Sequence, residues 1–119
     1  MLRNLFGGPR AARTFTTITA DELKRRLDAG ERLFLLDVRS PEEYAHEGHI
    51  AGSHLLPLPM LALRLGDLPR DTPIVCVCRS GNRSGIAAEQ LARQGFGTVL
   101  NLGGGMLGWV RAGLPTERG

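Results

Sequence analysis

The sequence predicts an α/β protein with a mostly parallel sheet that is covered by helices on both faces. Short apolar runs alternate with amphipathic helical patterns along the 119 residues, as in folds built from strand–helix–strand units. Residues 32–38 are almost continuously apolar, which is typical of a strand buried on both sides. A later segment shows the helical spacing i, i+3, i+4, i+7, i+8. Its inward positions are Ser84, Ala87, Ala88, Leu91 and Ala92.

The individual elements are placed from their end signals. A first strand is expected at residues 15–18, and Thr19 with Glu22 forms a capping-box pattern that starts a helix. Ser40, followed by Pro41, starts a second, short helix. The other expected elements are a short strand near residue 56, a mostly buried helix at 57–66, strands at 74–77 and 99–102, a helix closed by Gly95, and helical turns at 106–111.

Length and composition fit one soluble globular domain. Hydrophobic residues make up 42% of the chain and charged residues 23%. We expect this domain at residues 14–119, after a flexible N-terminal tail at 1–13, for which a short membrane- or partner-binding segment is the alternative. No apolar run approaches the roughly 18 residues of a membrane span. The net charge of +3 comes from scattered side chains, so no nucleic-acid-binding surface is indicated.

Cysteine usage indicates a reducing location. Cys76 and Cys78 are the only cysteines, and on a strand they lie at or beyond the distance limit for a disulfide. The sequence therefore does not describe a disulfide scaffold, and we expect a cytoplasmic protein.

The stretch at residues 74–85 is the candidate active site. A buried strand stops at Cys78, a short polar loop follows, and a helix starts near Arg83. Loop amides and the positive end of the helix dipole meet at such a junction, bind anions and stabilise a thiolate. Arg79 and Arg83 add positive charge, and Gly81 permits the sharp backbone path. Cys78 is therefore predicted to be the nucleophile, whereas Cys76, inside the apolar strand, is predicted to be a core residue.

The histidines do not complete a familiar catalytic set. Nothing in the local pattern places His46, His49 or His54 beside Cys78, so no Cys–His hydrolase motif is evident. His46 and His49 have no evident third ligand, so no metal site is expected. His49 is interpreted as a turn residue bonded to backbone, and Trp109 as a core residue.

Three separated motifs carry a family resemblance. They are the loop at residues 78–84, the segments 36–39, 43–44 and 48–53, and the glycine-rich turn before a tryptophan at 105–109. In this order they resemble the single-domain form of the rhodanese (thiosulfate sulfurtransferase) family, over roughly residues 15–115. The resemblance implies a rhodanese-like fold, with about five strands in a mostly parallel sheet and helices on both faces.

The resemblance also implies an activity. Cys78 would take the outer sulfur of a small anionic donor such as thiosulfate, form a persulfide held by loop N–H groups, and pass the sulfur to cyanide or to a thiol, including a protein thiol. Neither a metal nor an organic cofactor is implied. Asp37 and Arg39 would support the site structurally. The implied substrate-binding residues are Arg79, Ser80, Gly81, Asn82, Arg83 and Ser84.

Two alternatives remain beside the enzyme. The first is a non-enzymatic sulfur-relay or partner-binding module that handles sulfur only when docked to a partner. The second is a cysteine phosphatase or arsenate reductase. Related phosphatases separate Cys and Arg by five residues, whereas four residues separate Cys78 from Arg83. The shorter loop suits one sulfur atom better than a tetrahedral phosphate, and Ser84 stands where the longer loop would need its arginine.

Overall fold

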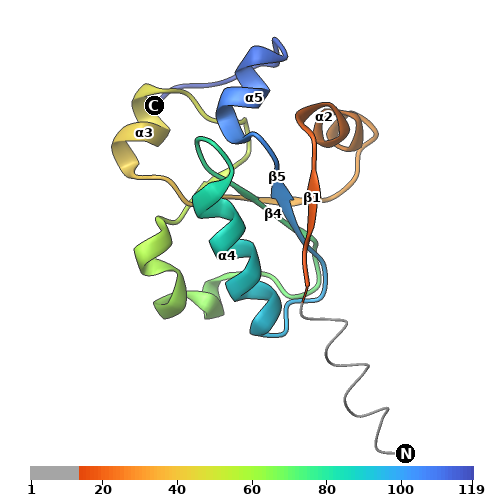
Figure 1. Ribbon diagram of the computed structural model, residues 1–119, viewed down its shortest axis with the longest axis vertical. Coiled ribbons are helices and arrows are strands. Elements are labelled where there is room, and N and C mark those ends of the chain that lie inside the picture. The colour runs from red at the N-terminus through yellow and green to blue at the C-terminus, as the bar shows by residue number, and fades with distance from the viewer. Residues whose placement is uncertain (1–13) are drawn as a thin grey trace, which may run out of the picture.

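The computed structural model describes residues 14–119, and the tail predicted at 1–13 lies outside the described residues. Within the described part of the chain, five strands form one sheet in the order β1-β5-β4-β2-β3, and every pairing is parallel. This confirms the predicted fold class. Figure 1 labels β1, β5 and β4 of this sheet. The strands are β1 (Thr16–Ile18), β2 (Phe34–Asp37), β3 (His54–Leu55), β4 (Ile74–Val77) and β5 (Val99–Leu102).

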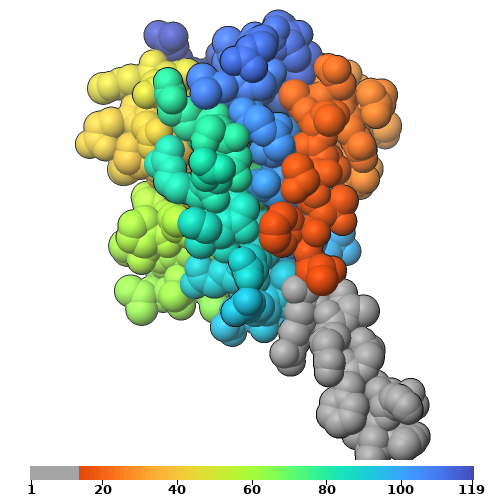
Figure 2. Space-filling model, in the orientation of Figure 1, coloured from red at the N-terminus to blue at the C-terminus, as the bar shows by residue number. Residues whose placement is uncertain are grey.

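Helices cover both faces of the sheet. The α-helices are α2 (Ala20–Asp28), α3 (Pro41–His46), α4 (Asn82–Arg93) and α5 (Gly105–Arg111), and the 3-10 helices are η1 (Leu58–Leu63) and η2 (Leu65–Asp67). In Figure 2 the residues of α4 spread over the middle of the face in view, between η1 and β1. No helix within residues 14–119 is long and apolar enough to cross a membrane.

The sheet separates the core into two clusters, and the central strand β4 contributes side chains to both. Ile74 and Cys76 point to the side of α4 and η1, where they join a cluster that includes Leu91. Val75 and Val77 point to the other side and join the cluster of α2 and α5. This alternation is the period of two that a pleated strand imposes. It extends one residue past the strand, so the side chain of Cys78 faces α4.

Both predicted N-caps are present, but the capping box predicted at Thr19 is only half formed, because the Glu22 carboxylate accepts from Arg26 instead. The Thr19 hydroxyl accepts the Glu22 N–H at 3.1 Å at the start of α2. Ser40 and Glu43 form a reciprocal capping box at the start of α3. These bonds set where each chain segment leaves the sheet edge, and Glu43 is thereby positioned for a second role at the site.

The prediction of a mostly buried helix at 57–66 is wrong. The segment forms two 3-10 helices, in which Leu61 is buried and Leu63 is 80% exposed. The Met60 N–H donates to the Pro57 carbonyl, three residues back, at 2.8 Å, which is the bond of a 3-10 helix, and Gly66 is a poor helix former. The leucine spacing therefore overstated the helical character of this segment.

Candidate active site

The candidate nucleophile lies at the carboxyl edge of the sheet. Cys78 directly follows β4 and is completely buried. The neighbouring strand β2 continues past its end in the same register, with the Val38 N–H donating to the Val77 carbonyl at 2.9 Å. Side chains that follow β2 and β4 are therefore brought to one edge, where ligands bind in open α/β sheets.

The loop after Cys78 turns back over the sulfur. Gly81 has φ of +106°, a left-handed conformation that a side chain disfavours, and α4 begins at the next residue. The turn brings the Gly81 N–H to 3.0 Å from Cys78 Sγ. The hydroxyl of Ser84, in the first turn of α4, lies 3.3 Å from the same sulfur. The predicted cradle of donors is thus formed by loop amides together with one buried hydroxyl.

These donors change the acidity of the thiol. Burial by itself would raise the pKa of Cys78, because a low-polarity environment disfavours the charged form. The Ser84 hydroxyl and the backbone N–H groups of Ser84, Gly81 and Ser80 act in the opposite direction and stabilise the thiolate. The net result is a pKa of Cys78 below the ordinary value for a thiol.

Asn101 belongs to the same network, although the sequence pattern does not predict it as a site residue. It lies in β5, is 7% exposed, and its Oδ1 accepts the Ser84 hydroxyl at 2.6 Å. Its Nδ2 donates to the Gly81 carbonyl at 3.4 Å. The only sequence signal was a polar residue at a position where the pattern of β5 demands burial.

The start of α5 holds the loop from the other side. The Met106 N–H donates to the Cys78 carbonyl at 2.8 Å, and the Leu107 N–H donates to the Arg79 carbonyl at 3.0 Å. A Cβ atom on Gly105 would lie 2.5 Å from both of these carbonyl oxygens. The glycine-rich motif near the C-terminus therefore allows a helix start to approach the Cys78 loop closely.

Arg83 is already paired within the protein. Its guanidinium makes two bonds of 2.7 Å to the two carboxylate oxygens of Glu43, in α3. The Arg83 hydrogen bond outweighs partial burial and lowers the pKa of Glu43 to about 2. This pair ties the first turn of α4 to α3, so part of the Arg83 charge is neutralised. Arg79 is more exposed and lies 3.5 Å from Glu47.

Asp37 and Arg39 form a buried ion pair at the end of β2. Arg39 Nε and Nη2 donate to the two Asp37 oxygens at 2.9 and 2.8 Å, and Nη2 also donates to the Gly48 carbonyl at 2.9 Å. His49, next in the chain, bonds the Tyr44 carbonyl through Nδ1 at 2.9 Å, which confirms its turn role. The pair thus anchors the segment after α3 to the sheet edge.

The six predicted substrate-binding residues divide by exposure. Arg79, Ser80 and Asn82 are exposed, Gly81 and Arg83 are half-buried, and Ser84 is buried beside the sulfur. A hollow of about 290 Å³ borders this loop at Arg83. It is lined by Val38, Arg39, Ser40, Pro41, Pro57, Leu58, Pro59 and Arg83.

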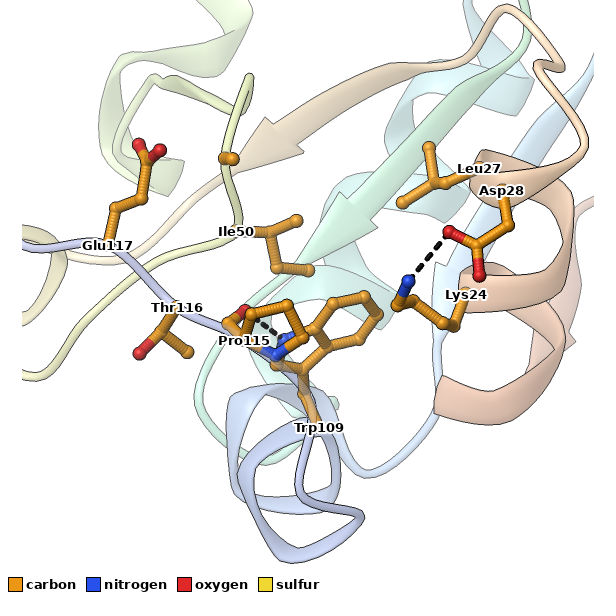
Figure 3. A pocket seen from close by; sticks show the side chains of 9 residues that line it. Lys24, Leu27, Asp28, Ile50, Trp109, Pro115, Thr116 and Glu117 are labelled. Atoms are coloured by element: carbon orange, nitrogen blue, oxygen red, sulfur yellow. Dashed lines mark hydrogen bonds and ion pairs between the residues drawn. The ribbon is translucent and has the colours of Figure 1, made fainter.

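A second hollow of about 360 Å³ lies elsewhere, between α2, the end of α5 and the C-terminal segment (Figure 3). Lys24 at its rim is paired with Asp28 at 2.6 Å, and the indole of Trp109 forms its floor and donates to the Pro115 carbonyl at 2.8 Å. Its lining residues do not include the Cys78 loop. It is therefore separate from the candidate active site.

Comparison with known proteins identifies the class. The sequence model of the family described as the Rhodanese-like domain matches residues 19–112. A protein named sulfurtransferase from Allochromatium vinosum is 42% identical over 98 residues, covering 82% of this chain and 91% of the relative. The chain belongs to the rhodanese-like domain family.

Two further matches are to longer proteins. One, from Bacillus subtilis, is named putative sulfur carrier protein YrkF and is 37% identical over 99 residues, covering 83% of this chain and 53% of that protein. The other is the solved structure of thiosulfate sulfurtransferase from Pseudomonas aeruginosa. It superposes with a TM-score of 0.80 at 31% identity and covers 92% of this chain and 21% of that one. The chain spans about half or less of these two proteins.

Proposed function

We propose that this protein is a sulfurtransferase that carries sulfane sulfur on Cys78. The observation that carries the proposal is the convergence of the Gly81 N–H and the Ser84 hydroxyl on Cys78 Sγ, 3.0 and 3.3 Å away. Donors that stabilise a thiolate provide a nucleophile at neutral pH. The loop N–H groups also suit a persulfide, whose charge lies one sulfur further out. The family membership and the names of the relatives support the same chemistry.

The reaction takes two displacements. The Cys78 thiolate attacks the outer sulfur of thiosulfate, the S–S bond of the donor breaks, and its electron pair leaves with sulfite. Cys78 then carries a persulfide with the negative charge on its terminal sulfur. Cyanide or a thiolate attacks that terminal sulfur, and the electron pair of the broken bond returns to Cys78 as thiolate. Charge and electrons balance in each step, and the scheme is a ping-pong mechanism.

The loop side chains have distinct parts in this proposal. Arg79 is exposed at the loop surface, where its charge attracts an anionic donor. Because Cys78 is buried, the loop that follows it has to move before the donor can reach the sulfur. Arg83, held by Glu43, keeps the loop attached to α3 while this happens. The Asp37–Arg39 pair supports the neighbouring strand end and has no chemical step in this scheme.

Intact-mass analysis after incubation with thiosulfate tests the proposal. The wild-type protein should gain the mass of one sulfur atom, and cyanide should remove it. Cys78→Ser should gain none. Cys76→Ala is the matched control and should load like the wild type, because Cys76 lies in the core. A wild-type protein that gains no sulfur from thiosulfate, mercaptopyruvate or a low-molecular-weight persulfide would refute the proposed enzyme.

The choice of donor has its own test. If Arg79 attracts anionic thiosulfate, Arg79→Ala should raise KM for thiosulfate several-fold and leave KM for an uncharged persulfide donor nearly unchanged. Equal changes for both donors would remove this role from Arg79.

The two reduced cysteines fit a reducing, cytoplasmic setting for this chemistry.

The second candidate function is a sulfur relay. The similarity to a protein named as a putative sulfur carrier favours it, as does the exposure of Arg79, Ser80 and Asn82 around the site. A relay would hand sulfur to one protein thiol and turn over cyanide slowly. Loading Cys78 with labelled sulfur and comparing transfer to free cyanide with transfer to candidate protein thiols separates the two functions. Fast cyanide turnover would exclude a relay that needs a partner.

A further inference from the structure

The Ser84 hydroxyl has one hydrogen and two acceptors within reach. Cys78 Sγ lies 3.3 Å from Ser84 Oγ, and Asn101 Oδ1 lies 2.6 Å from it on the other side. A hydroxyl donates only one hydrogen bond at a time. Ser84 and Asn101 are both buried, so water does not freely replace either partner. The sulfur and the Asn101 carbonyl oxygen therefore compete for one donor.

The charge on Cys78 decides this competition. When Cys78 is a thiolate, its full charge attracts the Ser84 hydrogen, and Asn101 Oδ1 loses its donor. An acceptor left unpaired in a buried site costs free energy. When Cys78 carries an extra sulfur, the negative charge moves to the terminal sulfur and Sγ is neutral. The Ser84 hydrogen then turns to Asn101, and the network is satisfied.

We propose that Asn101 is a positioning residue that competes with the Cys78 thiolate for the Ser84 hydroxyl and receives its hydrogen bond when Cys78 is loaded with sulfur. This role rests on the proposed sulfur transfer through Cys78. By weakening the stabilisation of the empty thiolate, Asn101 keeps the sulfur nucleophilic and favours the loaded state. It acts on the sulfur through Ser84, also holds the loop through its bond to the Gly81 carbonyl, and does not touch the reacting sulfur atoms.

The position of Asn101 suits this role. Its Nδ2 donates to the carbonyl of Gly81, the residue whose own N–H bonds Cys78 Sγ. Both ends of the amide are thus engaged with the loop around the sulfur. A Cβ atom built on Gly85 would lie 3.7 Å from this nitrogen, so α4 packs closely over the amide without a side chain between them.

Other ionisable groups also act on the sulfur, and they stay constant in the test. Cys76 lies on the same side of the sheet and is influenced by the charge of Cys78. Arg83 on α4 feels the charges of Cys78 and of Asp37 at the end of β2, and it is paired with Glu43 on α3. Asp37 is itself paired with Arg39. Substitutions at Asn101 leave all of these groups in place.

The test measures the rate of Cys78 alkylation by iodoacetamide as a function of pH. Asn101→Leu removes the competing acceptor and fills its space against water, so Ser84 donates to the sulfur alone. The apparent pKa of Cys78 should fall by about one pH unit. Asn101→Asp keeps the size, holds the Ser84 hydrogen more strongly and adds charge, so the apparent pKa should rise by at least about one pH unit.

The Ser84→Ala background is the matched control. Without the hydroxyl, Asn101→Leu should no longer lower the apparent pKa of Cys78, and the rise caused by Asn101→Asp should shrink to the part due to charge. The proposal would be overturned if Asn101→Leu did not lower the apparent pKa of Cys78 in the Ser84-containing protein, or if it lowered this pKa equally in both backgrounds. If Asn101→Leu does not fold, as judged by its thermal transition, the Asn101→Asp pair decides: an equal rise in both backgrounds would overturn it.

These measurements are independent of sulfur transfer. Alkylation needs no sulfur donor, so its pH profile tests only the role of Asn101 in setting the acidity of the Cys78 thiol. The proposed function is tested separately, by whether Cys78 is loaded with sulfur. A loaded state favoured by Asn101 has its own readout. At a fixed ratio of thiosulfate to sulfite, the fraction of persulfide should fall several-fold in Asn101→Leu, and an unchanged fraction would contradict this part of the proposal.

Discussion

Cys76 and Cys78 lie two residues apart, face the same side of the sheet and are both completely buried, yet their thiols differ in acidity. Burial raises the pKa of Cys76 to about 12, and the nearby Cys78 charge adds to this effect. Burial acts on Cys78 in the same direction, but hydrogen-bond donors reverse it.

The difference shows that exposure alone does not make a cysteine reactive. The strand ladder already uses the backbone N–H groups around Cys76, whereas those of the loop after Cys78 are free to point at a sulfur. The end of the strand is therefore the decisive feature.

Alkylation should separate the two thiols most strongly. With a pKa of about 12, only about one Cys76 thiol in ten thousand is ionised at about pH 8. Cys78 should therefore react with iodoacetamide at least about 100-fold faster in the folded protein. Peptide mapping by mass spectrometry after a timed reaction measures both rates. In denaturant the rates should converge, and comparable rates in the folded protein would contradict the comparison.

Displacing the loop should remove much of the contrast. Gly105→Ala places a Cβ atom against the Cys78 and Arg79 carbonyl oxygens, 2.5 Å away, at a φ of +55°. We expect the free energy of unfolding to fall by about 2–4 kcal/mol and Cys78 alkylation to slow. Gly113→Ala is the control, because its φ is also positive but no atom lies within 4 Å. It should cost about 1 kcal/mol and leave Cys78 alkylation unchanged.

Removing one donor should shift Cys78 partway toward Cys76. Ser84→Ala deletes the hydroxyl 3.3 Å from the sulfur while keeping the backbone N–H groups. The apparent pKa of Cys78 should rise by about one pH unit, which slows alkylation about ten-fold below that pKa. The pH profile of the alkylation rate measures this. An unchanged profile would mean that the loop amides alone set the acidity of Cys78.

The Arg83–Glu43 pair should make the smallest contribution, with a distinct pH dependence. The folded-state pKa of Glu43 is lowered from 4.5 to about 2. The contribution of ionised Glu43 to the free energy of unfolding is therefore complete above about pH 4.5 and is lost as the pH falls toward 2. At neutral pH, Arg83→Gln should destabilise the protein by about 1 kcal/mol, since the pair is partly exposed.

Urea unfolding at several pH values checks this pair. The difference between Arg83→Gln and wild type should shrink to a small remainder near pH 2, where Glu43 is about half protonated in the wild type. Arg64→Gln is the matched control, because Arg64 and Asp67 form an exposed pair at 2.7 Å. That change should cost no more than about 0.3 kcal/mol. A pH-independent loss in Arg83→Gln would show that packing, and not the ion pair, is what Arg83 contributes.

The sequence alone determined the main features of this protein. Alternating apolar runs and helical patterns determined the α/β class, because period and burial are local properties of a segment. The spacing of small and apolar residues predicted the buried face of α4. Ser40 and Thr19 predicted the starts of their helices, because their side chains can cap a helix N-terminus. The position of Cys78 between a buried strand and a helix start marked the candidate site, and the motif order marked the family.

The way in which that site is completed depends on contacts between segments that lie far apart in the sequence. Asn101 and Gly105 reach the Cys78 loop from β5 and α5, and Glu43 reaches Arg83 from 40 positions earlier in the chain. No local pattern predicts such contacts, because parallel strands and their crossovers bring distant segments to one edge of the sheet. The acidity of Cys78 depends on these contacts, since a buried thiol is controlled by the donors that surround it.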